Sequence, residues 1–488
     1  MVCISRFKKS QNAKTSNLTD DPFDLDRALL RVTAHDVWRI RDACEGTVIF
    51  GGTGSGKTSG SGETIAKAFL AAGFGGLVLT AKNDECALWQ RYARETGRAD
   101  DLILFSPEEP RRFNFMNYEL TRPGRGAGIT QNLVNALSTA LEIAERRNRS
   151  SSDGYWQRTT QQLLRNAIDL LAIATGSVSL PDLYRIITSA PASIAQSHEF
   201  AWQAHSFCFE CIRQGDNVAE SPIQAHDFEL AAEYWLREFP GIAEKTRSII
   251  ISSFTSMADC FLRGILRELF CTELSIVPEV CLDGGIIILN LPVKEFGQQG
   301  QFAQVVFKHL WQQAMERRNV LENPRPVFLW ADESQLFFVS NDREFQSTAR
   351  SARVCTVYLT QNLPSYYAAL GGESMARSET DAFLGNLQTK IFHCNSDRMT
   401  NEWAADLCAR SYQYRHNFGA AGTERRSSQS AGVSESLDYE ILPREFSRLR
   451  TGGPDNASIV DAIVYQSGRT WKASRKSFVR AQFLQKGF

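Results

Sequence analysis

The stretch Gly51-Gly-Thr-Gly-Ser-Gly-Lys57-Thr58 decides the fold that this sequence predicts. It matches the phosphate-binding pattern G-x-x-x-x-G-K-[ST] at every position, and it lies between a short β-branched and aromatic run, Thr47–Phe50, and a helical pattern over 57–72. Glycines let successive backbone N–H groups turn toward a β-phosphate, and the helix adds the positive end of its dipole. The pattern predicts a nucleotide-binding loop that consists of Gly51, Gly52, Thr53, Gly54, Ser55, Gly56, Lys57, Thr58 and Ser59.

A second motif supplies the acidic half of such a site. The run Pro326-Val-Phe-Leu-Trp-Ala-Asp332-Glu333 is an apolar strand pattern that ends in two carboxylates. We expect ATP and Mg²⁺ as cofactors, with Lys57 on the β- and γ-phosphates and with Thr58 and Asp332 holding the metal. Glu333 would orient and polarise the attacking water. An acidic residue at this place favours a hydrolysing enzyme over a kinase, which needs a separate acceptor.

A third strand pattern, Val354–Thr360, is flanked by side chains that can act on the γ-phosphate. Gln361 follows the strand and can hydrogen-bond the γ-phosphate or the attacking water, although a strand-end glutamine can equally face solvent. Arg350 and Arg353 precede the strand, and a guanidinium that reaches a neighbouring subunit's γ-phosphate would neutralise transition-state charge. The alternative is two ordinary surface arginines. The candidate catalytic residues are therefore Glu333, Gln361, Arg350 and Arg353.

The order of patterns around these motifs predicts an α/β fold with a mostly parallel sheet. Strand and helix patterns alternate over the first part of the chain, as in βαβ units, at 47–50, 57–72, 76–80, 85–94 and 102–105. Only helical spacing of apolar residues follows, until strand patterns return at 285–289, 327–331, 354–360 and 389–393. We expect a loose arm over 1–25, a nucleotide-binding domain over 26–116 and 276–488, and an inserted all-helical domain over 117–275.

Composition limits the possible partners. The 488 residues carry a net charge of −1, so the surface as a whole does not attract nucleic acid, and any DNA contact must use local basic patches. The eleven cysteines show no disulfide framework, which suits a reducing cytosol. The longest apolar stretch, 284–293, is far shorter than the roughly 20 residues of a membrane helix, so we expect a protein without a membrane span.

Three basic stretches are candidates for DNA contact. Arg146, Arg147 and Arg149 end a helical pattern, and further arginines, including Arg425 and Arg426, punctuate a Gly- and Ser-rich stretch that is typical of a mobile loop over 417–435. After Asp461 no acidic residue occurs, and basic residues alternate with aromatic ones. Basic loops follow phosphates and aromatic rings stack on bases. The alternative is a solvated face or, for the last stretch, a terminal strand with its apolar side buried.

These motifs together resemble one known family. The loop at 51–58, Ala331-Asp-Glu-Ser334 and Leu359-Thr-Gln-Asn362, with the helical patterns between them, resemble the type IV coupling proteins. These are the TraG/TraD-like ATPases of conjugation and type IV secretion, relatives of the HerA and FtsK translocases. Arg350 stands eleven residues before Gln361, where that family tends to carry its trans-acting arginine. The resemblance covers about 45–465 and is thinnest in the helical segment.

The resemblance implies an ATP-driven motor. It implies a RecA-like domain with an inserted all-helical domain, a self-assembled ring of six subunits with ATP at the interfaces, and single- or double-stranded DNA in the channel. Partners would be a secretion channel, a relaxase or an effector protein. Typical members begin with membrane-spanning helices, and this sequence shows none, so we expect it in the cytoplasm or, through a partner, at the inner membrane. The alternatives are a HerA-like motor with a nuclease or defence partner, and a nucleotide-gated scaffold.

Overall fold

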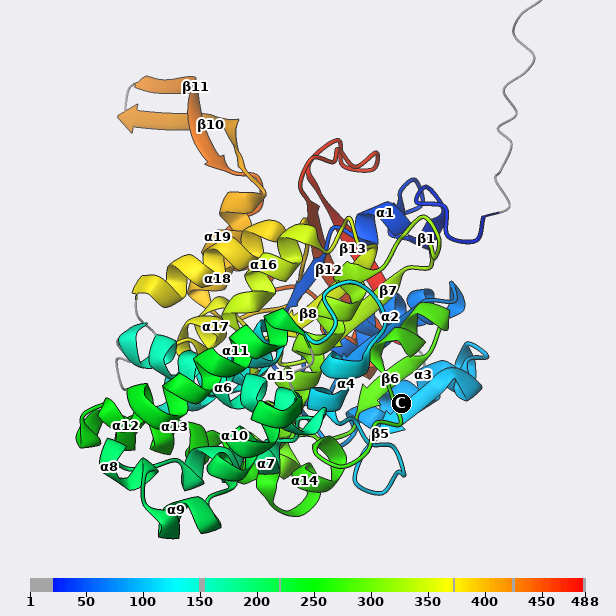
Figure 1. Ribbon diagram of the computed structural model, residues 1–488. Coiled ribbons are helices and arrows are strands. Elements are labelled where there is room, and N and C mark those ends of the chain that lie inside the picture. Colours follow the sequence, from blue (N-terminus) through cyan, green and yellow to red (C-terminus); the bar gives the residue numbers. More distant parts are fainter. Residues whose placement is uncertain (1–20, 149–153, 219–220, 372–373, 424–425, 486–488) are drawn as a thin grey trace, which may run out of the picture.

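A nine-stranded sheet organises the molecule (Figure 1). The computed structural model describes residues 21–148, 154–218, 221–371, 374–423 and 426–485. The strands lie in the order β13-β12-β9-β3-β8-β7-β4-β6-β5, and those from β9 to β5 run parallel, whereas β12 and β13 are antiparallel. Their bounds are β3 (Thr47–Phe50), β4 (Gly75–Leu79), β5 (Leu102–Phe105), β6 (Ile286–Leu289), β7 (Val327–Ala331), β8 (Val354–Thr360), β9 (Thr389–Phe392), β12 (Ile459–Gln466) and β13 (Phe478–Leu484).

Both faces of the sheet are buried, because alternate residues of each strand point to opposite faces. In β3, Val48 and Phe50 pack into one apolar cluster, and Ile49 packs into the other. On the side of Ile49 the sheet is covered by α2 (Glu63–Ala71) and α3 (Glu85–Glu95), together with α1 (Ile40–Ala43). On the other side lies α15 (Val293–Arg317). This helix is nearly encased, because it packs between the sheet and the helices that follow β5.

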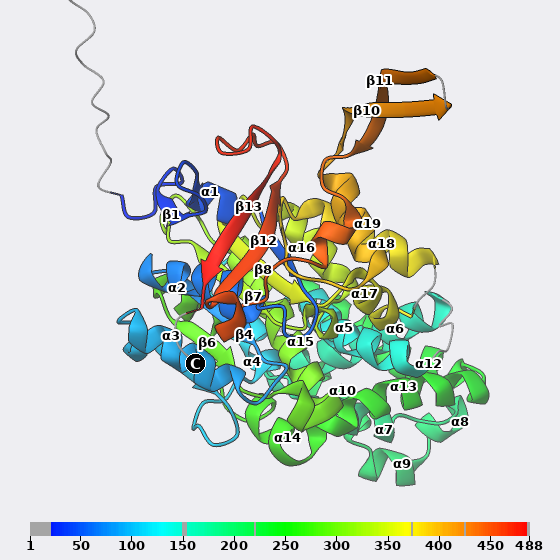
Figure 2. The same cartoon turned by 180° about the vertical axis from the view of Figure 1, so that it is seen from behind.

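The segment between β5 and β6 is built from helices in its described residues. They are α4 (Phe115–Thr121), α5 (Thr130–Asn148), α6 (Gly154–Thr175), α7 (Leu180–Ser189), α8 (Ile194–Ser197), α9 (Phe200–His205), α10 (Phe207–Val218), α11 (Pro222–Glu233), α12 (Phe239–Gly241), α13 (Glu244–Leu262) and α14 (Gly264–Phe270). Phe113 forms an antiparallel bridge with Leu274, so the two ends of the segment lie side by side. Its apolar core is continuous with the α15 side of the sheet, and Figures 1 and 2 show it as one lobe against that side.

Most strand predictions agree closely with the structure. The strands predicted at 47–50, 102–105, 327–331 and 354–360 match β3, β5, β7 and β8 to the residue. The helix predicted over 57–72 begins instead with a π-helical turn, Thr58–Gly62, before α2. Local apolar patterns therefore placed the sheet well, whereas helix starts depend on contacts outside the helix.

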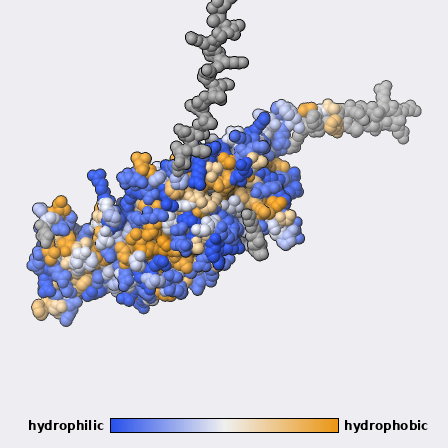
Figure 3. Space-filling view, turned by 90° about the vertical axis from the view of Figure 1, so that its right-hand side faces the viewer, coloured by the Kyte–Doolittle hydropathy of each residue, from blue (hydrophilic) through white to orange (hydrophobic). Residues whose placement is uncertain are grey.

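The prediction of a mobile loop over 417–435 is wrong. The described residues of this stretch, 417–423 and 426–435, belong to a long hairpin of β10 (Arg410–Thr423) and β11 (Arg426–Tyr439), which projects from the body in Figures 1 and 2. Tyr412 pairs with Leu437, so apolar residues at alternate positions share one face. That face is exposed, and Figure 3 shows hydrophobic side chains on the coloured part of the projection. The prediction failed because glycine and serine, which rarely favour strands, hid the two-residue period.

The described part of the basic stretch after Asp461 comprises the end of β12, a turn and the strand β13, and its aromatic rings do not form a DNA-stacking surface. The rings of Trp471, Phe478 and Phe483 are buried in the core. Several of its basic side chains pair within the chain: Arg469 with Asp42, Lys476 with Glu440, and Arg480 with Asp461. The alternative of a strand with its apolar side buried was the correct one.

The predicted arm lies mostly outside the described residues, which begin at Asp21. The last part of that arm packs against the body, because the Arg325 guanidinium lies 4.9 Å from the centre of the Phe23 ring. A two-stranded ribbon of β1 (Ala28–Arg31) and β2 (Val37–Arg39) follows. In the described part of the chain no helix by itself is long and apolar enough for a membrane span; one pair of helices, Arg158–Thr175 with Leu180–Ser189, meets the length and composition together but is bent by 110°.

Candidate nucleotide site

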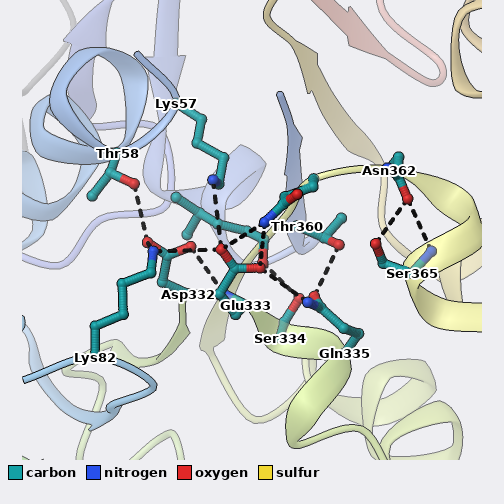
Figure 4. A network of polar contacts seen from close by, with 12 residues as sticks. Lys57, Thr58, Lys82, Asp332, Glu333, Ser334, Gln335, Thr360, Asn362 and Ser365 are labelled. Carbon is teal, nitrogen blue, oxygen red and sulfur yellow. Dashed lines mark hydrogen bonds and ion pairs between the residues drawn. The ribbon is translucent and has the colours of Figure 1, made fainter. Parts of the chain in front are cut away.

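The parallel strands bring four polar segments to one edge of the sheet. β3, β8, β7 and β4 are consecutive neighbours, and their carboxyl ends lie together. The glycine-rich loop follows β3, Gln361 follows β8, Asp332 and Glu333 follow β7, and Lys82 follows β4. Ligands of open α/β sheets bind at this edge. Figure 4 shows side chains from these segments converging on the two carboxylates.

The loop requires its glycines. Gly54 and Gly56 have φ values of 72° and 83°, a region that other residues rarely adopt. A Cβ on Gly56 would lie 2.7 Å from a methyl of Val460, and a Cβ on Gly51 would collide with Ser55. The Gly52 amide donates to the Cys394 carbonyl at 2.9 Å, which fixes the loop to the end of β9. The loop is thus held in the shape that cradles a phosphate.

A buried histidine supports the turn after the loop. The Nδ1 of His393 lies 3.0 Å from the Asp461 carbonyl, and its Nε2 lies 2.7 Å from the Ser61 hydroxyl. Burial lowers the pKa of His393 to about 4, so the ring is neutral at physiological pH. Because a carbonyl can only accept, Nδ1 carries the proton and Nε2 accepts from Ser61. His393 therefore joins the π-helical turn to β9 and β12.

Thr58 and Asp332 provide the oxygen ligands that Mg²⁺ prefers. The Thr58 hydroxyl donates to Asp332 Oδ2 at 3.0 Å, although the two residues lie 274 positions apart. The other carboxylate oxygen accepts from the Glu333 amide at 2.9 Å, and Glu333 has a φ of 47°. Both acidic side chains are buried. A hydroxyl and a carboxylate held in contact fit a site for a hard divalent cation.

The Glu333 carboxylate is surrounded by donors and positive charge. Lys82 Nζ lies 3.4 Å from Oε1 of Glu333, and Lys57 Nζ lies 3.9 Å from the same atom. The side-chain amide of Gln335 donates to Oε2 at 3.0 Å. Burial raises the pKa of Glu333, but the Gln335 hydrogen bond and the charges of Lys57 and Lys82 outweigh this and hold the pKa below its ordinary value. The group is therefore ionised at neutral pH and able to accept a proton or orient a water.

Gln361 points into the site. Its Nε2 donates to Glu333 Oε1 at 3.3 Å, and its backbone carbonyl accepts from the Asn395 side-chain amide at 2.7 Å. The structure thus places Lys57, Thr58, Asp332 and Glu333 together with Gln361. The alternative of a glutamine that faces solvent does not describe this geometry.

Two residues of the site were missed from the sequence. Lys82 lies between the carboxylates, and Glu85 accepts from the Ala81 amide at 2.7 Å. Burial, followed by the charge of Asp332, raises the pKa of Glu85 to about 8. Their signal was a run of polar residues directly after β4, and the prediction passed over it because the neighbour of β4 in the sheet was unknown.

Arg350 and Arg353 precede β8 and so lie at the opposite edge of the sheet, about 20 Å away for a strand of this length. The Arg353 guanidinium donates to the carbonyls of Phe23 and Pro324 at 3.1 and 2.9 Å. The Arg350 side chain is 70% exposed and lies 3.4 Å from Glu45. Neither reaches the nucleotide site of its own chain.

The candidate DNA-contacting arginines lie in or next to segments outside the described residues. Arg149 and Arg425 lie outside the described residues. Arg146 and Arg147 belong to α5 and Arg426 to β11, and the structure describes only their backbone.

Comparison with known proteins identifies the family. A family model for type IV secretory system conjugative DNA transfer matches residues 6–337, and no curated protein sequence matches. Solved structures with the same fold include the bacterial conjugative coupling protein TrwBdeltaN70 in an unbound form, with a TM-score of 0.60, 14% identity, and coverage of 93% of this chain and 87% of that chain. Plasmid coupling protein TrwB with the GTP analogue GDPNP gives 0.60, 15%, 95% and 91%, and with the ATP analogue ADPNP 0.59, 15%, 94% and 90%. They share the predicted α/β fold, and since the family model spans the phosphate loop and both carboxylates, the chain belongs to the type IV secretory system conjugative DNA transfer family.

Proposed function

We propose that this protein binds and hydrolyses ATP and uses the energy to move DNA in conjugative type IV transfer. The observation that carries the proposal is the ionised Glu333, held beside Lys57 and next to the Thr58–Asp332 pair. Nucleotide binding alone needs no such carboxylate, whereas hydrolysis needs a group that orients water. The same carboxylate argues against the alternative of a nucleotide-gated scaffold.

The site residues have separable roles in this proposal. The glycine-rich loop and Lys57 hold the phosphates, and Thr58 and Asp332 hold Mg²⁺, which would neutralise charge on the phosphate oxygens. Glu333 positions the attacking water and accepts its proton, and Gln361 contacts Glu333 at 3.3 Å and so is placed to respond to a γ-phosphate. TrwB structures contain ADP with Mg²⁺ and an ATP analogue, which supports these cofactors.

The exposed Arg350 supports assembly from several copies. Because it lies at the edge opposite the site of its own chain, an action of Arg350 on a nucleotide would have to be on that of a neighbour. We propose a ring, with six subunits as in the resemblance, in which Arg350 of each copy completes the next site. DNA would pass through the ring, the helical segment 117–275 would receive the substrate, and a secretion channel, relaxase or effector would hold the motor in the cytoplasm or against the inner membrane.

Steady-state ATP turnover of the full chain, with and without single- or double-stranded DNA, tests the proposal. DNA should stimulate turnover, because a motor advances only when it holds its track. Lys57→Ala is the control for contaminating ATPases and should be inactive under all conditions. A protein that binds ATP but shows the same negligible turnover with and without DNA would favour the scaffold.

A further inference from the structure

Lys82 is a second lysine of the nucleotide site, and it comes from the side away from the phosphate loop. It follows β4, which is the neighbour of β7 on the side opposite to β8 and β3. Its Nζ lies 3.7 Å from Asp332 Oδ2 and 3.4 Å from Glu333 Oε1. Figure 4 shows the ammonium groups of Lys57 and Lys82 both directed at these carboxylates.

The charge balance of the carboxylates depends on Lys82. Asp332 and Glu333 are adjacent and buried, with side chains 5% and 10% exposed, and buried carboxylates are costly without a counter-ion. Among the described side chains, Asp332 forms an ion pair with Lys82, and Glu333 forms ion pairs with Lys82 and Lys57. Lys82 is therefore the cation that the two carboxylates share.

Lys82 and Thr58 converge on the same atom. Asp332 Oδ2 accepts the Thr58 hydroxyl at 3.0 Å and lies 3.7 Å from the Lys82 ammonium. These are the two oxygens proposed to hold Mg²⁺. A divalent cation beside Asp332 would repel the Lys82 ammonium, so the two positive groups compete for one carboxylate.

We propose that Lys82 is a placeholder for the metal: it neutralises Asp332 while Mg²⁺ is absent, and it must leave Asp332 when Mg²⁺ binds. The inference rests on the proposed function, because it takes Thr58 and Asp332 as the metal ligands. Its consequence is that the free metal binds weakly and that Mg²⁺ is retained only with a nucleotide, whose phosphates supply further negative charge. Lys82 remains beside Glu333, so metal binding also changes the surroundings of the carboxylate that orients water.

Binding of Mn²⁺ to the nucleotide-free full chain tests this without any turnover. Mn²⁺ stands in for Mg²⁺, and the fall in the electron paramagnetic resonance signal of free Mn²⁺ reports binding. Lys82→Met should bind Mn²⁺ about tenfold more tightly than the wild type. The gain is no larger because Lys82 is 40% exposed and solvent screens its charge. Lys82→Arg keeps the charge and should resemble the wild type.

Controls assign the effect to this site. Lys245→Met removes the same charge from the exposed surface of α13 and should leave Mn²⁺ binding unchanged. Adding Asp332→Asn to Lys82→Met should abolish the gain. Lys82→Gln replaces Lys82→Met if the latter does not give a cooperative melting curve.

The outcomes separate the inference from the proposed function. Equal Mn²⁺ affinity of wild type and Lys82→Met would overturn the placeholder, even if the wild type binds a fluorescent ATP analogue with Mg²⁺. A gain that survives Asp332→Asn would also overturn it. Failure of the wild type to bind the ATP analogue with Mg²⁺ at all would instead refute the proposed function.

Discussion

The two ends of strand β8 differ in the surroundings of their polar side chains. At its carboxyl end, Thr360 donates to Gln335 at 3.0 Å and Gln361 donates to Glu333 at 3.3 Å, within a buried polar network from neighbouring strands. At its amino end, Arg350 is exposed and faces away from that network. The carboxyl end thus gathers the groups that can hold a nucleotide, whereas the arginine that we propose for hydrolysis lies at the other end, where only another copy could use it.

The amino end also separates the two candidate arginines, of which the family resemblance favoured Arg350. Arg353 is bound to two carbonyl groups of its own chain, and its φ of 50° is a conformation held by its surroundings. Among the described side chains, Arg350 forms one ion pair, with Glu45 at 3.4 Å, and its own side chain is 70% exposed. Arg353 is therefore structural, and Arg350 is the one available to a neighbour.

Lys57→Ala changes the nucleotide site at the carboxyl end and should have the largest effect on ATP binding and turnover. Loss of the one lysine of the phosphate loop should weaken ATP binding by about 100-fold or more, because a buried charge partner is removed. Turnover should vanish with it. Equilibrium titration with a fluorescent ATP analogue measures the loss, and wild-type affinity in this variant would show that the site has been assigned wrongly.

Arg350→Ala changes the amino end of β8 and should leave ATP binding intact. Turnover should fall about 1,000-fold, the lower range for an arginine that acts in trans, while ATP affinity stays near that of the wild type. The wild type's specific activity should rise with protein concentration as copies assemble.

A mixture sharpens the Arg350 test. Lys57→Ala and Arg350→Ala subunits are each inactive alone, but an interface that joins the intact loop of one to the intact arginine of the other should restore some turnover. A wild type that is fully active at high dilution, together with an unimpaired Arg350→Ala, would rule out the shared site.

Glu333→Gln changes the nucleotide site at the carboxyl end and separates ATP binding from ATP hydrolysis. The amide cannot accept a proton, so turnover should fall about 100-fold while ATP remains bound. The ATP-bound assembly should also last longer, which size-exclusion chromatography with ATP can follow. Wild-type turnover would remove Glu333 from the mechanism.

Arg353→Ala should have the smallest effect on chemistry. Its loss removes hydrogen bonds to two carbonyls and should lower the free energy of unfolding by about 2 kcal/mol, with turnover unchanged. Arg353→Gly should be less destabilising than Arg353→Ala, because glycine tolerates the positive φ. Denaturant titration measures both. A large fall in turnover with stability unchanged would give Arg353 the role proposed here for Arg350.

The sequence by itself determined the parts of the protein that local patterns encode. The glycine-rich loop, the apolar strands β3, β7 and β8, and the carboxylates after β7 each depend on a few consecutive residues, so their types and spacing predict them. The hairpin β10–β11 was not predicted in this way, because its small residues obscured the two-residue period of its strands.

Only the tertiary structure decided which of these parts meet. The neighbour order β3-β8-β7-β4 brings Lys82 to Asp332 and Gln361 to Glu333, and the packing around β9 places His393 against Ser61, in the turn after the phosphate loop. Arg350 and Arg353 are three residues apart, yet one is exposed and the other is bound within the chain. A sequence records positions along the chain, whereas these roles depend on groups hundreds of residues apart whose distance is set by sheet order and burial.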